Sequence, residues 1–85
     1  MKIQSSRLPQ ICKEFQDDIA NWKSYISKDP ILASTYAEDR KQLNIVLEYL
    51  KLGKFTSAKN KANSLDTIVR EVIPTTVWEL LEILG

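Results

Sequence analysis

Apolar residues recur every three or four positions along most of this 85-residue chain, and that spacing indicates helices with one buried face. The first such stripe has successive spacings of four, three, four, three and four residues. It predicts a helix over about 8–27, with Pro9 in the first turn, where a missing amide hydrogen costs nothing. The stripe consists of Leu8, Cys12, Phe15, Ile19, Trp22 and Ile26.

A second helix is expected over about 30–52. Pro30 pushes the residue before it out of helical geometry, so Asp29 is placed to cap the amides that follow. Asp39 and Arg40 interrupt the apolar stripe of this helix. Two interpretations stay open: the helix kinks or reaches the edge of the bundle there, or these charges form a specificity contact for a partner. The stripe consists of Leu32, Tyr36, Leu43, Val46, Leu47 and Leu50.

Gly53 stands where the end of a helix needs a residue that tolerates left-handed backbone geometry. A third helix is therefore expected over about 55–73. Two alanines in its first half permit close approach of the backbones, so we expect the second and third helices to be closest near Gly53 and to splay towards Ile73. The stripe consists of Phe55, Ala58, Ala62, Leu65, Val69 and Val72.

Pro74 ends the third helix, and Thr76 with Glu79 has the spacing of a capping box, which predicts a short helix over 76–84. The chain is too short to divide into pieces that would each bury a useful core. The pattern as a whole predicts an all-α fold: a small up-down bundle of three long helices plus a short C-terminal helix, in one domain over residues 1–85.

The segment around Gly53 resembles a tetratricopeptide hairpin, which implies two helices folded back on each other at this glycine. The positions that match are Tyr49, Gly53, Phe55 and Ala58. The positions that depart from the family are Gln42, Ala62 and Arg70, where it has a tryptophan, a second-helix aromatic residue and a closing proline. The resemblance covers about 34 residues, and we take it as support for the hairpin geometry rather than for membership of the family.

Composition restricts the classes of function. The chain is 44% hydrophobic and 27% charged with a formal net charge of +1, which is typical of a globular domain and supplies no overall field for a polyanion or a membrane. The single cysteine forms no intramolecular disulfide, and no apolar segment has the length of a signal peptide core or a membrane span. We therefore expect a cytoplasmic protein without membrane partners.

The chain contains no histidine, which removes the commonest general base, the usual nucleophile triads and most zinc sites. We expect no enzyme activity, no cofactor, no metal and no small-molecule substrate. Cys12 lies on the first apolar stripe and is interpreted as a buried packing thiol. The acidic pairs Asp17-Asp18 and Glu38-Asp39 point in different directions around a helix and are interpreted as solvated.

Four lysines lie between residues 49 and 65, a stretch without any acidic residue: Lys51, Lys54, Lys59 and Lys61. Such a cluster is a candidate anion-binding site, and it supports an alternative function as a nucleic-acid-associated regulator. A helix-turn-helix motif with its glycine at Gly53 would have a small residue four positions earlier and a branched apolar residue six later. This chain has Tyr49 and Lys59 there, so that motif is not indicated.

The C-terminal helix is the strongest functional candidate, because six of the nine residues from Thr76 to Leu84 are apolar. A surface helix in a small bundle needs fewer apolar residues, since it buries only one face. Either this helix closes the bundle, or part of it meets another chain. We expect a small non-catalytic protein-binding module, such as a regulator, inhibitor, immunity-type or adaptor protein. Its partner is another protein or a second copy of itself, and a homodimeric structural protein is a further alternative. The expected partner-binding residues are Trp78, Leu81, Leu84, Arg40 and Asp39.

Overall fold

The computed structural model describes residues 7–85 and is helical throughout its regular structure, which confirms the all-α prediction. Within the described part of the chain, no helix combines the length and apolar character needed to cross a membrane. The helices are α1 (Leu8–Ile26), α2 (Pro30–Thr35), α3 (Ala37–Lys51), α4 (Phe55–Asn63), α5 (Thr67–Arg70) and α6 (Thr75–Leu84).

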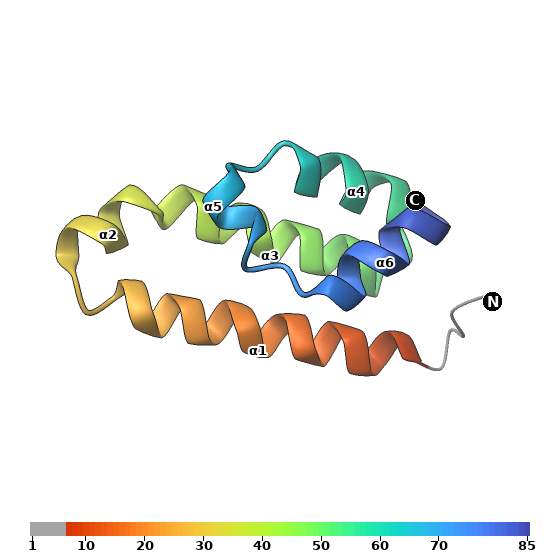
Figure 1. Ribbon diagram of the computed structural model, residues 1–85, viewed down its shortest axis with the longest axis horizontal. Coiled ribbons are helices and arrows are strands. Elements are labelled where there is room, and N and C mark those ends of the chain that lie inside the picture. Colours follow the sequence, from red (N-terminus) through yellow and green to blue (C-terminus); the bar gives the residue numbers. More distant parts are fainter. Residues whose placement is uncertain (1–6) are drawn as a thin grey trace.

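The helices form an elongated body of 43 × 22 × 19 Å. Helices α1 and α3 lie side by side in opposite directions, and α4 folds back along α3 (Figure 1). Helix α6 packs against both α4 and α1 and runs towards the end of the molecule where α3 turns into α4. At the opposite end, α2 contacts α1 and α3 without a comparable layer over it, so this end is thinner than the rest.

Helix α1 has the extent that the apolar stripe predicts. The turn after it also follows the prediction, because the Asp29 carboxylate accepts a hydrogen bond of 2.9 Å from the Ile31 amide and so caps α2. Gly53 adopts φ +75°, the left-handed geometry expected at the end of α3. Ala58 and Ala62 are fully buried, which allows α4 to lie close against α3 as their small size predicts.

The helix expected over 30–52 is two helices. Tyr36 leaves helical geometry at φ −103° and ψ 13°, which separates α2 from α3. Its backbone carbonyl still accepts from the Arg40 amide, so the second helix restarts at once. The Tyr36 ring packs edge-on against Trp22, with ring centroids 5.6 Å apart. The Tyr36 ring at this break therefore contacts α1. Asp39, where charge interrupts the apolar stripe, follows three residues later.

The helix expected over 55–73 also divides. The Ser64 hydroxyl donates to the Lys61 carbonyl over 2.6 Å, and Asp66 is extended at ψ 149°, so α4 ends and the short α5 begins after it. Serine and aspartate favour such local arrangements over helix interiors. Residues 7–85 therefore contain one helix of 19 residues, one of 15 and four shorter ones, in place of the three long helices of the predicted bundle.

Helix α6 begins earlier than predicted and without a capping box. The Pro74 carbonyl accepts from the amides of Val77 and Trp78, so the helix starts at Thr75 and Thr76 falls inside its first turn. The Thr76 hydroxyl oxygen is buried and has no hydrogen-bond partner within residues 7–85. The expected reciprocal bonds between Thr76 and Glu79 are absent there because Thr76 does not occupy the capping position.

The core runs along the line where α1, α3, α4 and α6 meet. It includes Cys12, which is buried among apolar side chains as predicted. The largest side chains with no exposed surface or almost none are Phe15, Ile26, Leu43, Val46, Leu50, Val69, Val77, Leu80 and Leu81.

Candidate protein-binding surface

The structure separates the expected contact residues of α6 from one another. Leu81 is 0% exposed and lies in the core with Val77 and Leu80, so it supports the fold and its assignment to a contact surface is corrected. Trp78 is half-buried and packs against the core. Leu84, in the last turn of α6, is 44% exposed. Most of α6 therefore closes the core, and only its last turn offers apolar surface.

The last turn of α6 lies beside the start of α4. The Thr56 hydroxyl donates to the Gly85 carbonyl over 3.5 Å, which brings the end of α6 to the first turn of α4. Leu52, at the end of α3, and Ile83 are also exposed at this end of the molecule. We call Leu52, Ile83 and Leu84 the terminal-end patch.

Asp39 and Arg40 lie in the first turn of α3 and are each partly buried. Within residues 7–85, the ion pairs join other side chains, namely Lys13 with Asp17 and Lys41 with Glu38. Along α3, Leu52 is about 20 Å from Asp39 at 1.5 Å per residue. The expected partner-binding residues therefore occupy opposite ends of the molecule and do not form one surface.

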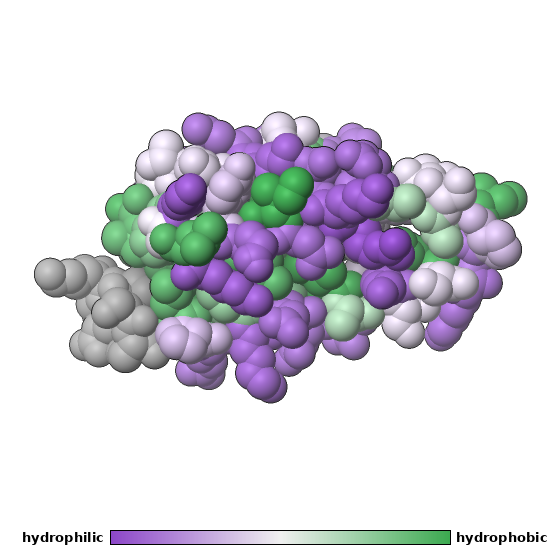
Figure 2. Space-filling model, turned by 180° about the vertical axis from the view of Figure 1, so that it is seen from behind, coloured by the Kyte–Doolittle hydropathy of each residue, from purple (hydrophilic) through white to green (hydrophobic). Residues whose placement is uncertain are grey.

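The α2 end carries two strongly exposed large apolar side chains. Ile31 is 75% exposed and Tyr25 is 65% exposed, and α2 has no buried residue at all. Trp22 and Tyr36, at the same end, are partly buried and contact each other. We call Trp22, Tyr25, Ile31 and Tyr36 the α2-end surface. Figure 2 shows hydrophobic side chains at this end and at the opposite end of one face, with a largely hydrophilic middle.

Charged side chains border the α2-end surface. Asp39 and Arg40 follow Tyr36 by three and four residues, the spacings at which helical side chains are neighbours. The sequence interruption at these two residues thus marks the edge of an apolar surface. Sequence analysis did not identify Tyr25 and Ile31, since both lie off the apolar stripes; the only signal was large apolar residues where the helical period expects polar ones.

The four lysines of the candidate anion-binding cluster do not gather on one face. Lys51 and Lys54 are exposed at the turn between α3 and α4, whereas Lys59 and Lys61 are partly buried on α4. Two residues of a helix that are two positions apart point about 200° from each other. The stem of Lys59 also lies beside Gly85 at the end of α6. A nucleic-acid backbone would therefore meet these charges on different sides of the molecule.

Burial raises the pKa of the Cys12 thiol, and the nearby Lys51 ammonium opposes this by favouring the thiolate. Burial is the larger effect, so Cys12 is protonated at neutral pH. Within residues 7–85, there is no group of three or more His, Cys, Asp or Glu side chains arranged to hold a metal ion.

No family model, curated protein or solved structure matches this chain. The function is therefore inferred from the surface of the protein itself.

Proposed function

We propose that this protein is a small, non-catalytic protein-binding module that recognises its partner through the α2-end surface. The observation that carries the proposal is the exposure of Tyr25 and Ile31 beside the half-buried pair Trp22 and Tyr36. A regulator, inhibitor, immunity-type protein or adaptor would act in this way, by occupying a surface of its partner.

The composition of the α2-end surface supports binding rather than incidental exposure. Tryptophan, tyrosine and arginine are the residues that contribute most binding energy at protein interfaces. Trp22, Tyr25, Tyr36 and Arg40 bring all three types to one end of a chain that has only seven aromatic residues. Since α2 buries none of its residues, its apolar side chains are not explained by a need to stabilise the core.

The partner that fits is a protein with an apolar patch bordered by both charge signs, because Asp39 and Arg40 lie at the edge of the surface. Partly buried charges at an edge select partners by excluding like charges. A second copy of this chain is the other occupant that we consider, since a self-complementary surface would pair Asp39 of one chain with Arg40 of the other.

Affinity capture from cells of the source organism tests the proposal. The double variant Tyr25→Ser with Ile31→Asp should abolish capture of the partner, and the matched control Leu52→Asp, at the terminal-end patch, should retain it. All three substituted side chains are exposed, so the helical circular dichroism of both variants should equal that of the unmodified protein. Loss of capture in the control alone would assign binding to the opposite end and overturn the proposal.

Light scattering over a range of concentrations distinguishes the two occupants. A mass of one chain at every concentration, together with capture of a different protein, supports the hetero-partner. A concentration-dependent dimer that Tyr25→Ser with Ile31→Asp dissociates identifies a second copy as the occupant. A dimer that this variant leaves intact, without any other captured protein, contradicts a binding role for the α2-end surface.

A further inference from the structure

A cavity of about 330 Å³, open to solvent on one side, lies between the first turns of α1 and the last turn of α3. It is at the opposite end of these helices from the α2-end surface (Figure 1). Most of its lining comes from α1, and Lys51 is the contribution of α3. The lining residues are Leu8, Pro9, Cys12, Lys13, Gln16 and Lys51.

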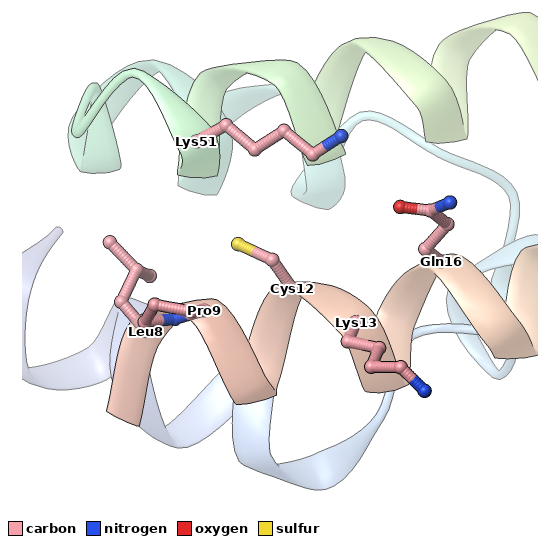
Figure 3. A pocket seen from close by; sticks show the side chains of 6 residues that line it. All are labelled: Leu8, Pro9, Cys12, Lys13, Gln16 and Lys51. Carbon is pink, nitrogen blue, oxygen red and sulfur yellow. The ribbon is translucent and has the colours of Figure 1, made fainter. Parts of the chain in front are cut away.

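The cavity has an apolar end and a polar end. Figure 3 shows the Lys51 side chain extending along the α3 side, with its ammonium group directed towards the Gln16 amide. Leu8 and Pro9 lie at the other end, and the Cys12 thiol points into the space between them and Lys51. One end of the cavity is therefore apolar, and the other end carries the Lys51 ammonium group and the Gln16 amide.

The Gln16 and Lys51 side chains of this cavity are both exposed. Within residues 7–85, Lys51 takes part in no salt bridge and the Gln16 side chain in no hydrogen bond. Lys13 differs, because its ammonium group points away from the cavity in Figure 3 and lies 3.8 Å from the Asp17 carboxylate. Lys51 is thus the cation that faces the cavity, and Lys13 provides a matched control.

We propose that this cavity binds a small carboxylate that carries a short apolar chain. The carboxylate accepts hydrogen bonds from the Lys51 ammonium and the Gln16 amide, and the chain lies over Cys12 against Leu8 and Pro9. Charge-assisted bonds of this kind are stronger than neutral ones, so the charge of Lys51 selects an anion. The cavity volume is near the lower limit of small-molecule sites, which restricts the ligand to a short chain.

Titration of the protein with hexanoate, followed by amide NMR shifts, tests this site. Hexanoate should shift the amides of Leu8, Cys12, Gln16 and Lys51 in a saturable way. Hexan-1-ol, which lacks the charge, and acetate, which lacks the chain, should each bind at least about 10-fold more weakly. No saturable shift at these residues, or equal binding of hexanoate and hexan-1-ol, would overturn the proposal.

Two lysine variants locate the charge that matters. Lys51→Met keeps most of the side-chain volume and should weaken hexanoate binding by about 10-fold or more, whereas Lys13→Met should change it by less than about 2-fold. Equal weakening by both variants would show general attraction of anions to the surface and contradict a defined site. Saturating hexanoate should also slow alkylation of Cys12, and unchanged alkylation would place the ligand elsewhere.

Discussion

Substituting Leu81 with alanine should strongly destabilise the protein, because its side chain is 0% exposed and lies where α6 meets the rest of the core. Fully buried leucines cost about 3 to 5 kcal/mol on truncation to alanine, through lost burial and the cavity left behind. A chain of 85 residues has a typical stability of roughly 4 to 13 kcal/mol. The melting temperature should therefore fall by at least about 12 °C.

Leu84→Ala is the matched control, since Leu84 belongs to the same helix and stripe but is 44% exposed. Its truncation should cost only about 1 kcal/mol. Urea unfolding followed by circular dichroism at the helical band measures both variants. If Leu81→Ala unfolds the protein outright, Leu81→Met should still fold, because this volume-conserving change costs less than about 1.5 kcal/mol. Equal, small effects of Leu81→Ala and Leu84→Ala would refute the conclusion that α6 closes the core.

Four further predictions concern Gly53, Cys12 and the lysines of α4. Gly53→Ala should cost about 1 to 2 kcal/mol in urea unfolding, purely from the left-handed backbone, because an added Cβ would meet no atom within 4 Å; a neutral effect would argue against the φ of +75°. Since burial raises the pKa of Cys12, its alkylation at pH 8 should be slower than that of an unfolded peptide and should slow further in Lys51→Ala. The raised pKa of Cys12 should also make the protein less stable as the pH rises from the pKa of the unfolded thiol to that of the folded thiol, because in this range the thiol ionises in the unfolded state but not in the folded state. A free energy of unfolding that increases over this range would contradict the prediction. Lys59 and Lys61 point to different sides of α4, so we expect no nucleic-acid binding that depends on both of them. Fluorescence anisotropy with a labelled oligonucleotide measures this. A salt-sensitive complex that is lost in the double variant Lys59→Glu with Lys61→Glu would support the alternative function.

The helical period predicts which side chains are buried better than it predicts where helices end. The extent of α1, the cap at Asp29 and the turn at Gly53 follow from local rules and are confirmed. A kink at Asp39 and Arg40 was one of two open interpretations, and the helix breaks just before them, at Tyr36. The break at Ser64–Asp66 is not predicted, because a stripe of apolar residues continues equally well through one helix or through two in succession. The local signal of the first break is the charged interruption just after it. The signals of the second are Ser64, whose hydroxyl donates to the Lys61 carbonyl, and Asp66, a residue type that favours turns over helix interiors.

The assignment of α6 shows why counting apolar residues misleads. A helix that packs on one neighbour needs fewer than six apolar residues in nine, so the excess over residues 76–84 favours a contact with another chain. In the structure α6 packs against both α4 and α1, so a wider part of its circumference is buried. Tyr25 and Ile31 were missed for the opposite reason, since single apolar residues off a stripe are common on protein surfaces, and the sequence does not show that both are exposed at the α2 end.

Stability and partner binding are therefore expected to depend on different parts of this chain. The core depends on α1, α3, α4 and α6, whereas α2 contributes no buried residue. Ile31 can consequently change without loss of a core contact, and the same is true of Tyr25, which lies outside the core cluster. The side chains of α2 are at most partly buried, so their contribution to the stability of the fold is small. We therefore expect substitutions of Tyr25 and Ile31 to change partner binding more than they change stability.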